Sequence, residues 1–432
     1  MLRISDNRRY LVQEDGTPFF WLGDTAWELF HRLSREEAEL YLSNRAAKGF
    51  TVIQAVVLAE LAGLTEPNAY GDLPLVDMDL GRPNEAYFGH VDHIVQSARE
   101  KGLYLGMLPT WGDKVVKAWG QGPDGFISAG TAAAWGRFLG ERYAEAPNLI
   151  WILGGDRTAE GYERVWREAA RGLREGDGGA HLMTYHPWGG HSSSAWLHEE
   201  AWLDLNLLQS GHGEKDGPNH RMIEHDYALT PVKPCLDGEP RYEDHPVGWK
   251  PEELGWFDDY DVRQAAYWAL FAGAHGHTYG CHDVWQFYRP GREPISWART
   301  PWQEALDLPG AFDMQHVRTL IESRPLLLRI PDQDLIVGDP GEGIDHVQAT
   351  RASDGSYAFV YLPTGKPVTV RLSKLAGEVR ASWFDPREGI AQEAGVYPNS
   401  SDRTFTPPAS GRGNDWVLVL DEAARDWPLP GR

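Results

Sequence analysis

The sequence predicts a (β/α)8 barrel followed by a small antiparallel β-sandwich. Over residues 1–325, eight short apolar runs alternate with longer stretches whose apolar residues recur at helical spacing. A strand-then-helix unit repeated eight times is the pattern of this barrel. After Arg324-Pro325 the pattern changes to short strands separated by turns, so we place the barrel at 1–325 and the second domain at 326–432. The alternative, a doubly wound sheet, is disfavoured because no glycine-rich phosphate loop follows the first run.

The expected barrel strands are short apolar runs, several of them rich in β-branched residues, as in TVIQAVVL at 51–58. Such runs, bounded by turn residues, are typical of strands buried on both faces. In chain order we expect strands over 19–24, 51–58, 103–108, 149–153, 181–186, 203–208, 232–236 and 276–279.

Helix signals follow most of these runs. Ser34 and Glu37 have the spacing of a capping box, which predicts a helix start at Ser34, and Gly49 ends that helix. The fifth and sixth units have weaker helical patterns. Further helices are expected over about 84–100, 131–146, 159–175, 259–272 and 302–323.

The second domain reads as alternating strands separated by turns such as Asp354-Gly355 and Thr364-Gly365. Few aromatic residues fall in its turns, so we expect it to pack against the barrel rather than to bind sugar. Its strands are expected over 334–337, 344–350, 357–362, 368–372, 379–384 and 416–420.

Composition excludes several function classes. The chain has 41 Lys+Arg and 63 Asp+Glu, a net charge of −22, which argues against binding to nucleic acid or to anionic lipid. No run is long enough to span a membrane, and the polar N-terminus lacks a signal peptide, so we expect a cytoplasmic protein. Two cysteines cannot form a disulfide framework and are expected to be buried thiols. Composition says nothing about oligomeric state.

Catalytic groups of such barrels lie where the strands end. Here those positions carry carboxylates, imidazoles and indoles, among them Glu60, Asp113, Trp188 and His212. They include no serine in a nucleophile elbow. Indole rings can stack on the apolar faces of a sugar, while carboxylates and imidazoles bind its hydroxyls. We therefore expect an oligosaccharide or small glycoside substrate, bound by Asp24, Trp27, Trp111, His186, Gln209, His282 and Trp285.

Asp156 and Glu239 are the strongest catalytic candidates. Each follows a very apolar run, and strands four and seven lie on opposite sides of a barrel rim. A pair there can flank one glycosidic bond, with one carboxyl group as acid and the other as nucleophile or base. The alternative for each is a structural role, such as capping a helix or pairing with Arg157 or Arg241.

Five motifs occur in order: FFWLGDTAW at 19–27, GFTVIQ at 49–54, NLIWILGGD at 148–156, LDGEPRYE at 236–243 and AHGHTYGCHDVWQF at 274–287. With them the chain resembles glycoside hydrolase family 140 of clan A, which includes endo-apiosidases acting on a plant pectin, and its second domain resembles a collagen-binding-type β-domain. The resemblance implies a retaining mechanism with Asp156 as acid/base and Glu239 as nucleophile, and no metal or other cofactor.

Rival functions remain on the same barrel. One is another exo-acting glycosidase, a furanosidase or a xylosidase, and another is a carbohydrate-binding protein without catalysis. A third is a metal-dependent amidohydrolase, for which His275, His277 and His282 with Asp283 would be the candidate ligands. That reading is disfavoured because no H-E-x-x-H helix or paired cysteines accompany them.

Overall fold

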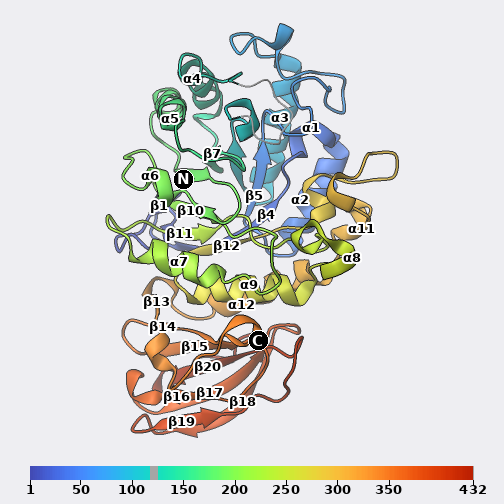
Figure 1. The fold of residues 1–432 in the computed structure, drawn as a ribbon. Coiled ribbons are helices and arrows are strands. Elements are labelled where there is room, and N and C mark those ends of the chain that lie inside the picture. Colours follow the sequence, from blue (N-terminus) through green and yellow to red (C-terminus); the bar gives the residue numbers. More distant parts are fainter. Residues whose placement is uncertain (117–124, 432) are drawn as a thin grey trace.

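The computed structural model describes residues 1–116 and 125–431 and contains the expected barrel (Figure 1). Within these residues, a nine-stranded sheet has the order β8-β7-β6-β5-β4-β12-β11-β10-β9, and every pair except β9–β10 is parallel. The predicted fold class is confirmed. The parallel strands are β4 (Trp21–Thr25), β5 (Val52–Val56), β6 (Tyr104–Leu108), β7 (Leu149–Gly154), β8 (Met183–His186), β10 (Asn206–Gln209), β11 (Cys235–Asp237) and β12 (Gly276–Tyr279).

The sheet closes between β8 and β10. Although no ladder joins them, the backbone N–H of Asp204 donates to the carbonyl of Met183 at 2.9 Å, and the Thr184 hydroxyl donates to the carbonyl of Leu205 at 2.8 Å. The short β9 (His191–Ser192) adds to β10 in the antiparallel sense. The eight strand ends therefore form one rim, as the strand-then-helix rhythm predicts.

Helices surround the strands. The predicted capping box is present at the start of α2 (Arg35–Ala47), where the Ser34 side chain accepts from the N–H of Glu37. The expected helix over 302–323 is divided into α11 (Trp302–Ala305) and α12 (Pro309–Glu322), because Pro309 has no N–H to continue a helix and begins a new one. The others are α1 (Leu29–Arg32), α3 (Glu85–Glu100), α4 (Ala132–Tyr143), α5 (Glu163–Asp177), α6 (Ser194–Leu197), α7 (Asn219–Ala228), α8 (Pro251–Leu254), α9 (Asp259–Phe271) and α10 (His282–Trp285).

The second domain is an antiparallel sheet of order β13-β14-β15-β20-β17-β18 with a two-stranded sheet, β16-β19, beside it. Three of its strands, β13, β18 and β19, were not predicted: β13 has only three residues, and exposed residues interrupt the apolar pattern of β18 and β19. The strand expected over 334–337 is absent, and a 3-10 turn over Gln333–Leu335 overlaps its start. The strands are β13 (Arg329–Pro331), β14 (Gln348–Ala352), β15 (Tyr357–Leu362), β16 (Val368–Arg371), β17 (Val379–Asp385), β18 (Ile390–Tyr397), β19 (Asp402–Phe405) and β20 (Trp416–Glu422).

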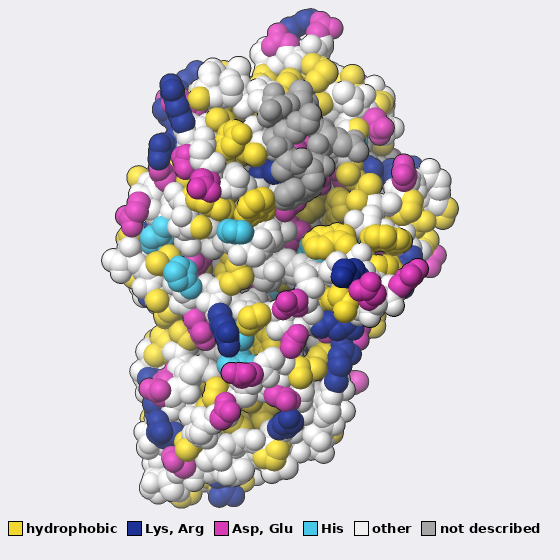
Figure 2. Space-filling model, viewed as in Figure 1, with side chains coloured by type: hydrophobic (Ala, Val, Ile, Leu, Met, Phe, Trp, Pro, Cys, Tyr) yellow, Lys and Arg dark blue, Asp and Glu magenta, His cyan; other side chains and the backbone are white. Residues whose placement is uncertain are grey.

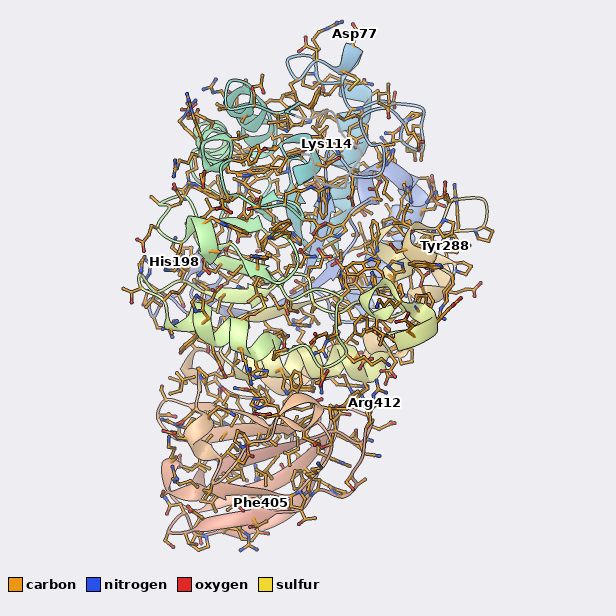
Figure 3. All side chains as sticks on the ribbon, in the orientation of Figure 1. Asp77, Lys114, His198, Tyr288, Phe405 and Arg412 are labelled. Atoms are coloured by element: carbon orange, nitrogen blue, oxygen red, sulfur yellow. The ribbon has the colours of Figure 1, made fainter. Side chains whose placement is uncertain are left out.

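This domain packs beneath α9 and α12 of the barrel (Figure 1). Arg263 on α9 is 1% exposed and lies 2.9 Å from Asp415 of the β-domain. Arg412 of the β-domain lies 2.8 Å from both Asp258 and Asp261 at the start of α9, and Figure 3 places it at the junction. The Arg263–Asp415 pair is buried, and a buried ion pair that loses one partner is strongly destabilising, so this contact fixes the two domains together.

A three-stranded sheet, β1 (Arg3–Ile4), β2 (Leu11–Val12) and β3 (Pro18–Phe19), precedes the barrel. None of the helices in the described part of the chain has the length and apolar character needed to cross a membrane.

Candidate active site

A cavity of about 970 Å³ opens at the carboxyl ends of the barrel strands. In Figure 2, hydrophobic side chains are gathered on the visible face of the barrel. Most of the side chains expected from the sequence to bind substrate lie in the wall of this cavity. They are Trp27, Trp111, Gln209, His282 and Trp285, and the catalytic candidates Asp156 and Glu239 line it too, whereas His186 is 0% exposed and does not.

Asp156 lies at the end of a turn that two glycines make possible. After β7, Gly154 and Gly155 have φ of 87° and 112°, and Asp156 itself has φ of 53°. A Cβ on Gly155 would lie 2.7 Å from a ring carbon of Trp111, and one on Gly154 would lie 2.4 Å from the carbonyl of His186. Aspartate is among the few residues that adopt left-handed backbone readily. The Gly-Gly-Asp sequence therefore directs this carboxyl group into the cavity, where 22% of the side chain is exposed.

Glu239 follows β11 and is held by two imidazoles. Nε2 of His186 lies 2.8 Å from its Oε2, and Nε2 of His212 lies 3.1 Å from its Oε1. His186 ends β8, and His212 follows β10, so three neighbouring segments of the rim converge on this one carboxyl group.

His186 also contacts the loop of the other carboxyl group. The backbone N–H of Asp156 donates to Nδ1 of His186 at 3.2 Å. Because Nδ1 accepts a hydrogen bond, the ring proton of the neutral imidazole is on Nε2, which faces Glu239. One imidazole thus connects the backbone of Asp156 with the side chain of Glu239.

The two carboxyl groups have opposite pKa shifts. Burial, with the negative charge of Glu239, raises the pKa of Asp156 to about 6 against the opposing effect of Arg157. Burial also acts to raise the pKa of Glu239, but hydrogen bonding from His186 and His212 outweighs it and lowers that pKa to about 2. Near pH 5 one group is protonated and the other ionised, which is the pairing that acid-assisted displacement needs.

Aromatic rings surround the pair. The ring centroids of Trp27 and Trp111 are 5.0 Å apart, and those of Trp27 and His186 are 5.2 Å apart. These rings exclude water from the pair and offer flat apolar surface to a sugar ring.

Gln209 and His282 differ in what they can offer a ligand. Oε1 of Gln209 is buried and, among the described residues, has no hydrogen-bond partner. The ring of His282 is occupied, because its Nδ1 accepts from Trp285 and its Nε2 donates to the carbonyls of Ile295 and Ser296. Gln209 can therefore bind a hydroxyl group, whereas His282 presents mainly its ring to the cavity.

The expectation that Asp24 contacts substrate is wrong in this structure. Asp24 is 0% exposed, accepts from Nε of Arg45 at 2.6 Å and from the Tyr41 hydroxyl at 2.5 Å, and does not line the cavity. It lies within β4, and its side chain points to α2 rather than to the lumen, because successive strand residues face opposite sides.

Two other side chains of the site were among the rim residues in the sequence but were not chosen. His212 follows a strand, which was the available signal, yet only the fold brings it to Glu239. Glu60 follows β5 and lines the cavity, and burial with the charge of Asp156 raises its pKa to about 8. A neutral carboxyl group there can donate a hydrogen bond to a ligand.

No group of three or more His, Cys, Asp or Glu side chains in the described part of the chain is arranged to hold a metal ion. His275 and His277, considered as ligands, are buried, and burial lowers the pKa of each to about 3. Cys235 and Cys281 are buried free thiols, as expected.

Comparison with known families assigns the barrel. Residues 5–327 match the family model described as "Apiosidase-like, catalytic domain". The chain belongs to this apiosidase-like family. Residues 330–421 of the apiosidase-like chain match the model described as "Putative collagen-binding domain of a collagenase". The resemblance seen in the sequence is thereby confirmed for both domains and for the glycoside hydrolase class.

Solved structures agree with this assignment. A protein described as a glycoside hydrolase is 37% identical, with a TM-score of 0.92 over 99% of this chain and 98% of the other. A structure described as a glycoside hydrolase family 5 from Bacteroides vulgatus ATCC 8482 is 36% identical, with a TM-score of 0.92 over 99% and 94% of the two chains. Comparison with curated proteins gives no match.

Proposed function

We propose that this apiosidase-like glycoside hydrolase is a retaining enzyme of family 140, with Glu239 as nucleophile and Asp156 as acid/base, acting on an apiose-containing oligosaccharide of plant origin. The observation that carries the proposal is the pair itself, in which a carboxylate held by two imidazoles shares a cavity with a carboxyl group of raised pKa. The five ordered motifs and the family match support the substrate class.

In the first step, an oxygen of Glu239 attacks the anomeric carbon and forms an ester bond while the bond to the leaving oxygen breaks. Asp156 gives its proton to that oxygen, so the leaving group departs as an alcohol. The His186 and His212 contacts keep Glu239 ionised and oriented for attack.

In the second step, water attacks the anomeric carbon and Asp156 takes the water proton. The ester bond breaks and returns Glu239 as a carboxylate. Because Glu239 carries no charge while it is glycosylated, its contribution to the raised pKa of Asp156 disappears in the intermediate. Asp156 is therefore a better base at the stage when a base is needed.

Two measurements test the proposal. The first is a hydrolysis screen with 4-nitrophenyl apiosides, arabinofuranosides, xylosides and glucosides, with Glu239→Gln as the control. The second is the anomeric configuration of the first-formed product, followed by proton NMR. Retention with apiosides as the best substrates is expected. Inversion would overturn the two-step mechanism, and a preference for xylosides or arabinofuranosides would assign the barrel to one of the rival exo-acting glycosidases.

A further inference from the structure

Two exposed tryptophans lie on matching turns beside the cavity: Trp249 lines it, and Trp297 directly follows Ser296, which lines it. Pro246-Val247-Gly248-Trp249 and Pro294-Ile295-Ser296-Trp297 each form a 3-10 turn that begins after proline and ends at tryptophan. The two turns follow β11 and β12, which are neighbours in the barrel. The exposed fractions of Trp249 and Trp297 are 51% and 55%, whereas Trp27 and Trp111 are buried.

The backbone of both turns is left-handed over two consecutive residues. The φ angles are 57° at Gly248 and 58° at Trp249, and 46° at Ser296 and 63° at Trp297. A bulky residue with positive φ is uncommon and costs about 1–3 kcal/mol, and such residues persist at functional sites when the surroundings hold them. Asp77 and Met78 have the same conformation away from the cavity, so it is the exposure of the two indoles beside the cavity that indicates a shared role.

The turns are fixed to the catalytic wall. His282 donates to the carbonyls of Ile295 and Ser296, and both of these residues line the cavity. Trp249 also lines it, with its ring centroid 5.4 Å from that of His245.

The loops that carry the turns are joined to each other as well. Arg299, two residues after Trp297, donates from Nε to Oδ1 of Asp244 at 2.9 Å and stacks on Trp256 at 3.7 Å. The loops that carry the two tryptophans are therefore both held in place by these contacts.

The size of the cavity exceeds what one sugar ring needs. Its volume of about 970 Å³ lies at the upper end of the roughly 300–1,000 Å³ typical of sites for drug-sized ligands. Exposed indole faces beside such a cavity lose unfavourable contact with water when a ring stacks on them.

We propose that Trp249 and Trp297 form a second sugar-binding site at the cavity mouth, which stacks a ring of the substrate beyond the one attacked by Glu239. This inference rests on the proposed function and names the residues that bind a second sugar ring of its oligosaccharide substrate. The alternative is that the same two side chains bind a protein partner, and the following test distinguishes this from sugar binding.

The test compares wild type with Trp249→Ala, Trp297→Ala and the double variant. Phe312→Ala is the matched control, since Phe312 is 45% exposed on α12 and contacts Lys48 rather than the cavity. The readout is the ratio of kcat/KM on a pectin-derived oligosaccharide fraction to kcat/KM on a 4-nitrophenyl monoglycoside. Each tryptophan variant should lower this ratio about tenfold, the effect of one interaction of about 1.4 kcal/mol. The control should leave the ratio within about twofold.

Calorimetric binding to Glu239→Gln, alone and combined with the tryptophan changes, separates this inference from the proposed function. If wild type hydrolyses no glycoside in the screen, the proposed function fails, and weaker binding of the oligosaccharide fraction after the tryptophan changes still supports the second site. An unchanged ratio in an active enzyme overturns the second site. Oligosaccharide binding that is the same with and without the tryptophan changes would also overturn the second site.

Discussion

Nε2 of His186 lies 2.8 Å from Oε2 of Glu239, while the other nitrogen of the same ring accepts from the backbone of Asp156. This bridge sets the ring orientation and determines which nitrogen carries the proton. It also couples the positions of two strand ends that lie far apart in the sequence. His186 acts through Glu239, and we regard it as a positioning residue.

Removing this imidazole should impair the reaction more than substrate binding. His186→Ala should lower kcat roughly ten- to a hundredfold with a small change in KM, because hydrogen bonds to charged groups contribute about 1.5–3 kcal/mol. Loss of the imidazole also removes a cause of the low pKa of Glu239, so the acidic limb of the pH profile should move upward. His186→Gln, which retains an N–H donor, should restore part of kcat. An unaltered acidic limb would show that the ring is merely structural.

The two carboxyl groups should respond differently to substitution. Asp156→Asn should lower kcat about 10²–10⁴-fold on glycosides with poor leaving groups, the usual contribution of a general acid. On 2,4-dinitrophenyl glycosides, whose leaving group needs no proton, a rapid burst should precede slow turnover. Glu239→Gln should show no burst on either. Stopped-flow absorbance makes the comparison, and a burst from Glu239→Gln would contradict its role as nucleophile.

Activity should fall as the pH rises through about 6. The reaction needs Asp156 protonated and Glu239 ionised, and their pKa values are raised to about 6 and lowered to about 2. Above pH 6 the protonated fraction of Asp156 decreases about tenfold per pH unit, while Glu239 remains ionised down to about pH 2. The measurement is kcat/KM from pH 4 to 8, with circular dichroism at each pH as the check on folding. A profile that stays level to pH 8 would contradict the assignment of Asp156.

The glycine turn before Asp156 should be intolerant of side chains. In Gly155→Ala the new Cβ would lie 2.7 Å from Trp111 and 2.9 Å from the backbone nitrogen of Gly112, at a φ of 112°. We expect it to lower the free energy of unfolding by about 3 kcal/mol or more. Gly161→Ala is the matched control, with φ of 79° and no atom within 4 Å of the Cβ, and should cost about 1 kcal/mol. Equal losses in urea denaturation would argue against this packing.

Asp24 should affect stability rather than chemistry. Asp24→Asn leaves the buried guanidinium of Arg45 without its carboxylate and should cost about 3–5 kcal/mol of unfolding free energy. Asp77→Asn, which breaks an exposed pair with Arg82, should cost at most about 1 kcal/mol. Figure 3 shows Asp77 at the far end of the barrel from the β-domain. Lower activity of Asp24→Asn at unchanged stability would restore Asp24 as a substrate contact.

The sequence by itself determined the barrel, its strand order and the two rim carboxylates. Each strand is a short apolar run, and residues placed directly after such runs must lie at the rim whatever the packing around them. Trp151 and Trp268, expected in the core from their apolar surroundings, are both 0% exposed. The capping box at Ser34 was also predictable, because it depends on two residues three positions apart.

Tertiary structure decided which rim residues touch one another. Asp24 lies within β4 and Trp27 follows it, and Asp24 faces Arg45 outside the barrel whereas Trp27 faces the cavity. His212 meets Glu239 only because β10 and β11 are neighbours, and the raised pKa of Asp156 arises from burial and from a charge far away in sequence. Spacing along the sequence predicts local geometry. The electrostatic and hydrogen-bond partners of rim residues depend instead on distances that only the closed barrel sets.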